Sequence, residues 1–66
     1  MHPTALVPIT EMPIEGQEFF HWTEAHGTRK AMILTVYDTI GQCRVLFAAG
    51  SPYPQLVQTI DLYTEV

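Results

Sequence analysis

The clearest pattern along the chain is a pair of apolar runs that flank a short polar stretch. The runs cover residues 31–37 and 43–48, and residues 38–41, with the sequence Asp-Thr-Ile-Gly, lie between them. Aspartate at the first position and glycine at the last position are typical of a type I turn. Apolar, β-branched and aromatic runs on both sides of such a turn predict a β-hairpin.

The register of this hairpin decides which side chains share a face. If Asp38 faces Gly41, one face is wholly apolar, whereas a left-handed bulge at Gly41 would place Asp38 opposite Gln42 and mix the two faces. Burial of one face specifies the register strongly, so we predict the first pairing. The predicted core is then Met32, Leu34, Val36, Cys43, Val45 and Phe47.

The second face of the predicted hairpin is also largely apolar. It carries Ala31, Ile33, Thr35, Tyr37, Gln42, Arg44, Leu46 and Ala48. Strands that are apolar on both sides are usually covered on both sides, here by the arm and tail of the chain or by another molecule. Because aromatic residues and arginine are enriched at interface centres, we predict a surface that binds a protein partner. Its residues are Trp22, Ile33, Tyr37, Arg44 and Leu46.

The start of the chain has a different character. Prolines at positions 3, 8 and 13 exclude a long helix there. We expect residues 1–16 to form an extended arm, with an edge strand as an option because proline is tolerated at a sheet edge. Residues 17–66 then form a hairpin-based core, and residues 1–66 together form a single small domain.

Two other segments are compatible with either a strand or a helix. Residues 17–26 favour a strand over 19–24 because of their aromatic and β-branched content, while Gly27 would also suit the end of a helix. Residues 54–66 alternate in a way that favours a strand over 57–65, although their apolar spacing also fits a helix. We predict an all-β fold, a small antiparallel meander of three or four strands with an extended N-terminal arm, or a β-rich α+β fold if either segment is helical.

Composition narrows the class of protein. The chain has 66 residues and a hydrophobic fraction of 47%, which is normal for a folded domain. Cys43 is the single cysteine, so no disulfide can form within the chain, and a lone thiol fits a reducing compartment. The N-terminus lacks the basic and apolar regions of a signal peptide, and no apolar run is long enough for a membrane span. We expect a cytoplasmic protein with no membrane partner.

Charge excludes one class of partner. Three basic residues stand against seven acidic ones, which gives a net charge of −4. Nucleic acid binding needs several cations to neutralise phosphates, so direct binding of DNA or RNA is not expected. The acidic residues are scattered rather than clustered, which permits docking on a basic protein surface.

Candidate catalytic and metal-binding residues do not converge. His21 and His26 are five residues apart, which places them on opposite faces of a strand or roughly 140° apart on a helix, and neither arrangement lets both reach one ion. Cys43 lies on the apolar face of the hairpin, where cysteine behaves as a small hydrophobe. The glycines are dispersed and form no phosphate-binding loop. We therefore predict no catalytic residue, no metal site and no cofactor.

These patterns favour a small non-enzymatic protein-binding module or inhibitor that occupies a surface of a larger protein. Small phage- or plasmid-borne inhibitors, anti-CRISPR proteins among them, are similar in short length, acidity and lack of an active site, without a shared motif. The alternative is a structural subunit that assembles with copies of itself, because exposed strand edges and surplus apolar area serve both roles.

Overall fold

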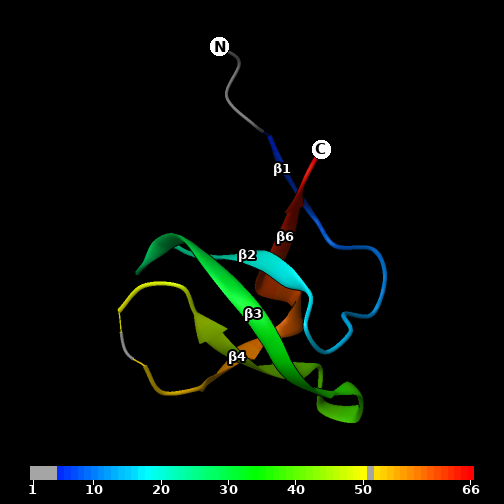
Figure 1. Cartoon of the computed structure of the whole chain (residues 1–66). Helices are drawn as coiled ribbons and strands as arrows, with labels where there is room; N and C mark the ends of the chain where they lie inside the picture. Colours follow the sequence, from blue (N-terminus) through cyan, green and yellow to red (C-terminus); the bar gives the residue numbers. More distant parts are fainter. Residues whose placement is uncertain (1–4, 51) are drawn as a thin grey trace.

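The computed structural model describes residues 5–50 and 52–66, which form one antiparallel sheet with the strand order β1-β6-β2-β3-β4-β5 (Figure 1). The strands are β1 (Leu6–Pro8), β2 (Glu18–Thr23), β3 (Gly27–Tyr37), β4 (Gln42–Phe47), β5 (Gln55–Gln58) and β6 (Leu62–Glu65). Two short 3-10 helices, η1 (Asp38–Ile40) and η2 (Thr59–Asp61), separate β3 from β4 and β5 from β6. The all-β prediction is confirmed, and the sheet has more strands than the three or four expected.

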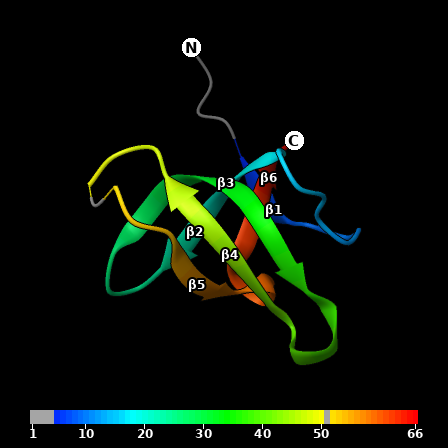
Figure 2. The same cartoon turned by 60° about the horizontal axis from the view of Figure 1, so that its bottom comes forward.

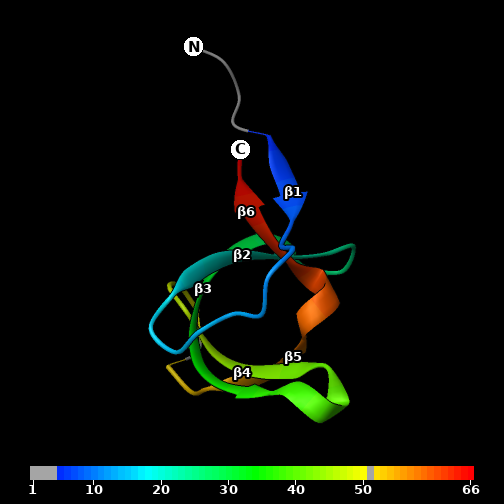
Figure 3. The ribbon, with the colours of Figure 1, turned by 90° about the vertical axis from the view of Figure 1, so that its right-hand side faces the viewer.

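Strands β2 to β5 form the predicted meander, in which each strand pairs with the next one. After β5, the η2 helix redirects the chain so that β6 returns to β2, where His21 faces Leu62. The arm adds β1 to the free side of β6, with Val7 opposite Thr64. The sheet curls toward one side, as Figure 3 shows, and the inner face of the curl holds the core.

The core draws on four strands. Ile33, Val45, Cys43 and Leu62 are the largest fully buried side chains. Ile33, Val45 and Leu62 each contribute about 1.5–3 kcal/mol through full removal of the side chain from water. The complete buried cluster is Ala31, Ile33, Cys43, Val45, Phe47, Val57 and Leu62, with Ile9, Phe19 and Val36 packed against it.

The β3–β4 hairpin confirms half of the predicted register and corrects the other half. Near the turn, Val36 faces Cys43 and Tyr37 faces Gln42, as expected. Between Ile33 and Thr35 the register shifts by one residue, so that Ile33 faces Val45. A one-residue shift moves every following side chain to the opposite face.

The predicted assignment of Met32 and Leu34 to the core is therefore wrong. Ala31 and Ile33 occupy the core instead, whereas the assignment of Cys43, Val45 and Phe47 is confirmed by their burial. The physical reason is the register shift, which turns Ala31 and Ile33 inward. Ala31 then lies directly between Phe19 on β2 and Phe47 on β4. A methionine at this place would overfill the space between the two rings.

The turn of this hairpin combines features of both alternatives. Gly41 has φ 64° and ψ 37°, the left-handed conformation of the bulge alternative. Its amide donates to the Asp38 carbonyl at 3.2 Å. The strand pairing next to the turn nevertheless follows the preferred register, because Tyr37 and not Asp38 faces Gln42.

The tail forms strands, as favoured, with one difference. The single strand expected over 57–65 is interrupted by η2, so β5 and β6 belong to different parts of the sheet. Thr59 donates its amide to the Gly41 carbonyl at 2.9 Å, which ends the β4–β5 pairing beside the β3–β4 turn. The arm, expected to be extended with an edge strand as an option, supplies the edge strand β1, and residues 1–4 of the predicted arm lie outside the described residues. Strand β5 is left as one edge of the sheet, visible next to β4 in Figure 2, and β1 forms the other edge.

Candidate protein-binding surfaces

The side of the sheet opposite the core, called here the outer face, carries a strip of large apolar side chains. Register places Met32 opposite Leu46 on one row and Phe20 opposite Tyr63 on another. These four side chains define the apolar strip, and each is half-buried. None of them belongs to the core cluster or packs against it. The strip therefore remains as apolar surface on the outer face.

The predicted partner-binding residues divide between the two faces. Tyr37, Arg44 and Leu46 share the outer face with Trp22, as their pairings with Gln42, Thr35, Met32 and Thr28 show. Ile33 does not, because it is 1% exposed and faces Val45 inside the core. Its assignment to a binding surface is corrected by the same bulge that moved Met32 outward.

The outer-face residues that were predicted do not form one cluster. Trp22 is 45% exposed and faces Thr28 near the first end of β3, whereas Tyr37 is the last residue of that strand. At about 3.3 Å per residue, these two positions are roughly 30 Å apart along β3. The apolar strip lies between them, so a partner that contacts both Trp22 and Tyr37 would also cover the strip.

Sequence reasoning missed three members of the apolar strip. Phe20 alternates with Trp22 on β2, a signal that the sequence does contain. An alternating sequence pattern does not reveal the bulge, so it predicts Met32 in the core and not on the outer face. Tyr63 reaches the strip only through the pairing of β6 with β2, which joins residues far apart in the sequence.

A charged pair lies between the two halves of the strip. Lys30 Nζ lies 4.0 Å from Glu18 Oε2, and both side chains are more than half exposed. Exposed ion pairs of this kind contribute about 0–1 kcal/mol to stability. Glu18 faces Met32 and Lys30 faces Phe20, so the charged pair lies on the outer face between the Phe20–Tyr63 pair and the Met32–Leu46 pair.

The inner face holds an unusual group of polar side chains around Phe47. His21 packs edge-on against this ring, with the ring centres 5.5 Å apart, and the Arg29 guanidinium lies 3.8 Å from the ring centre. His21 and Arg29 face each other across β2 and β3. His21 Nδ1 and Arg29 Nε are buried and have no hydrogen-bond partner within the described residues.

The surroundings of His21 disfavour its protonated form. Burial lowers the pKa of the imidazole below its ordinary value of 6.5, and the charge of Arg29 lowers this pKa further. His26 acts in the same direction as Arg29, while the Asp61 carboxylate on η2 raises the pKa. Neutral imidazole is therefore the form that fits the core.

The two histidines that sequence reasoning considered as metal ligands are separated by burial. His21 is buried, whereas His26 is exposed in the β2–β3 turn, where Thr23 Oγ1 accepts a hydrogen bond from its backbone amide at 3.3 Å. Over residues 5–50 and 52–66, no group of three or more histidine, cysteine, aspartate or glutamate side chains could hold a metal ion.

Cys43 lies in the core and links two elements. Its side chain is fully buried, and its Sγ lies 3.2 Å from Thr59 Oγ1, within hydrogen-bond distance for sulfur. This contact joins β4 to η2 beside the backbone bond between Thr59 and Gly41. A buried thiol in this setting acts as a small core residue.

A tight turn in the arm builds the wall of a groove. Gln17 donates its amide to the Ile14 carbonyl at 3.1 Å, and its Oε1 accepts from the Ile14 amide at 2.8 Å. Gly16 has φ 89°, which glycine adopts without strain. Gly16 donates to the Ile33 carbonyl and Gln17 accepts from the Ile33 amide, so a glycine bulge attaches the turn to β3.

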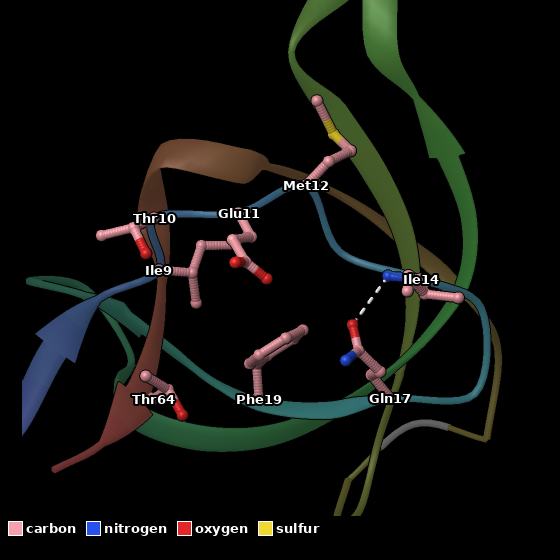
Figure 4. Close-up of a pocket in the computed structure, with 8 residues that line it drawn as sticks. All are labelled: Ile9, Thr10, Glu11, Met12, Ile14, Gln17, Phe19 and Thr64. Atoms are coloured by element: carbon pink, nitrogen blue, oxygen red, sulfur yellow. Dashed lines mark hydrogen bonds between the residues drawn. The ribbon is translucent and has the colours of Figure 1, made fainter.

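The groove lies between this arm and the strands β2 and β6, and its volume is about 180 Å³. Figure 4 shows the side chains of Ile9, Glu11 and Phe19 pointing toward one another across it, while Met12 points away. Phe19 and Thr64 belong to the inner side of the sheet, so the groove and the apolar strip lie on opposite sides. The lining residues are Ile9, Thr10, Glu11, Met12, Ile14, Gln17, Phe19 and Thr64.

Comparison with known proteins gives no match to a family model, to a curated protein or to a solved structure. Within the described part of the chain, no helix has the length and apolar character needed to cross a membrane.

Proposed function

We propose that the chain is a non-enzymatic protein-binding module that acts by occupying a surface of a larger protein through its outer face. The observation that carries this proposal is the apolar strip of Phe20, Met32, Leu46 and Tyr63, which lies on the face of the sheet away from the core. Large, partly exposed apolar side chains beside charged ones are typical of protein interaction sites. Inhibition of the larger protein is one activity that such occupation would produce.

The arm and the tail are engaged elsewhere, which supports a cover supplied by another molecule. Ile9 packs against the core and donates its amide to the Leu62 carbonyl at 3.2 Å. Residues 16 and 17 bond to Ile33, and the tail provides the strands β5 and β6 of the sheet itself. The arm therefore bonds to β3 and to the start of β6, and the tail forms strands of the sheet.

The test is quantitative affinity purification from the source cells with the intact chain and two variants. Leu46→Glu places a charge in the apolar strip, and Ile60→Glu is the matched control because Ile60 is 81% exposed on η2, outside the strip. We expect partners to be retained by the chain and by Ile60→Glu and to be lost with Leu46→Glu. Equal recovery with both variants, while both remain folded, would rule out the outer face.

A second candidate, a structural subunit of a homo-oligomer, is favoured by one observation. Strand β5 is a sheet edge with the sequence Gln-Leu-Val-Gln, which contains neither a charge nor a proline to block pairing. Every second residue of an antiparallel strand bonds to the neighbouring strand, and Thr59 bonds to Gly41. The backbone N–H and C=O groups of Leu56 and Gln58 therefore point away from β4, toward the open edge. Light scattering after gel filtration separates the candidates: a dimer that Leu56→Lys converts to a monomer supports self-assembly, and a monomer supports the binding module.

A further inference from the structure

The groove under the arm has a mixed lining with a single charged side chain. Ile9, Met12, Ile14 and Phe19 are apolar, and Thr10, Gln17 and Thr64 are polar. Ile9 and Phe19 form its interior, and Glu11 is the one ionisable residue among those that line it. Figure 4 shows the Glu11 carboxylate directed into the space above the Phe19 ring. A volume of about 180 Å³ is close to the roughly 150 Å³ of cavities that bind benzene, so the groove accommodates one side chain of moderate length.

The chain does not provide a cation for this carboxylate within its described residues. Its three basic residues are Arg29, Lys30 and Arg44, which lie on β3 and β4. The one ion pair that the described residues form joins Lys30 to Glu18. Among the described residues Glu11 therefore presents a negative charge without a cationic partner in a groove of mixed lining, in a chain whose net charge is −4.

We propose that this groove binds a cationic side chain, lysine or arginine, of a partner protein. The alkyl stem packs along Ile9 and Phe19 while the charged end reaches the Glu11 carboxylate, as long basic side chains do when their stems are buried. The Phe19 ring adds a cation–π contact. The Glu11 carboxylate is exposed, so its attraction to the cation has the modest size found for exposed ion pairs.

Exposed apolar side chains at the edge of the groove favour a protein partner over a free small molecule. Met12 and Ile14 line the groove and are both exposed, so an inserted side chain would be surrounded by apolar contacts to the surface that carries it. This inference rests on the proposed protein-binding role, but it uses the side of the molecule opposite the apolar strip. The two proposals can therefore fail separately.

The test is an NMR titration of the ¹⁵N-labelled chain with capped arginine, Nα-acetyl-arginine N-methylamide. Capped citrulline is the control probe, because it has nearly the same shape without the charge. Glu11→Gln is the test variant, and Glu15→Gln is the matched control, since Glu15 is exposed on the same turn and does not line the groove. The spectra also report whether each variant is folded.

We expect saturable shifts at the amides of the groove residues with capped arginine, and clearly weaker binding of capped citrulline. Glu11→Gln should weaken arginine binding about two- to fivefold, while Glu15→Gln should leave it unchanged. Equal binding of the two probes, equal effects of the two variants, or no saturable shift up to tens of millimolar probe would each overturn the proposal. Such a failure leaves the outer face untouched, because Leu46→Glu tests that face independently.

Discussion

The guanidinium carbon of Arg29 lies 3.8 Å from the centre of the Phe47 ring, on the face of the sheet that carries the core. The same ring receives the edge of His21, which faces Arg29 across the strand pair. One aromatic side chain thus holds a permanent cation and a titratable group close together. A second positive charge at His21 would meet both the apolar core and Arg29, so acid should destabilise the fold at this place.

The stability of the domain should decrease as the pH falls below about 6.5. Because the pKa of His21 is lower in the folded chain than in the unfolded one, the unfolded state binds the proton more tightly. The contribution of His21 is therefore complete above about 6.5 and declines from there down to its folded-state pKa. Urea denaturation at several pH values measures this decline. His21→Phe should flatten it, and an unchanged pH dependence in that variant would refute the assignment.

Arg29→Met should raise the pKa of His21 while it weakens the fold. The variant keeps the apolar stem against Phe47 but removes the charge that lowers the pKa of the imidazole. The loss of the cation–π contact should cost about 0.5–2 kcal/mol. NMR titration of the His21 ring protons measures the pKa. Lys30→Met, a change at the neighbouring exposed residue, is the control, and an equal pKa shift in both variants would show that Arg29 has no specific role.

Ile33→Ala and Met32→Ala should differ strongly in stability, although the two residues are adjacent. Ile33 is fully buried, so its truncation should cost about 2–5 kcal/mol, enough to unfold a domain of this size. Ile33→Val, at about 0.5–1.5 kcal/mol, provides a folded variant for comparison. Met32 lies on the outer face, and its truncation should cost less than about 1 kcal/mol. The reverse order in thermal denaturation would mean that the strand follows the unbulged register.

Trp22→Ala and Arg44→Ala should weaken association with the partner by about 1–3 kcal/mol and leave the fold intact. Both side chains are exposed on the outer face, so their removal opens no cavity in the core. Tyr37→Ala belongs to the same group but lies at the far end of β3. Isothermal calorimetry with the captured partner measures the effect. Full affinity in all three variants would restrict the interface to the apolar strip or exclude the outer face.

The residues that could be predicted from the sequence are those governed by local rules. The Asp38–Gly41 turn and the alternation of Cys43, Val45 and Phe47 on β4 follow from turn chemistry and from period-two burial, and both are confirmed in the structure. The aromatic content of 19–24 correctly favoured a strand over a helix.

The residues that could not be predicted depend on packing between distant segments. The bulge after Ile33 places Ala31 between two phenylalanines from different strands, an arrangement that no local pattern records. Tyr63 reaches the outer face through a pairing that spans most of the chain. The groove at Glu11 needs the arm, β2 and β6 to be in place before it has walls.

The pairing of β1 with β6 joins the most distant described parts of the chain, with Leu6 opposite Glu65. Closing so long a loop has a larger entropic cost than forming any hairpin of the meander, so this ladder should be the last to form and the first to open. Ile9 follows β1 directly and forms one wall of the groove. The groove is therefore present only in the population whose arm is docked, and a side chain bound next to Glu11 would shift the chain toward that population.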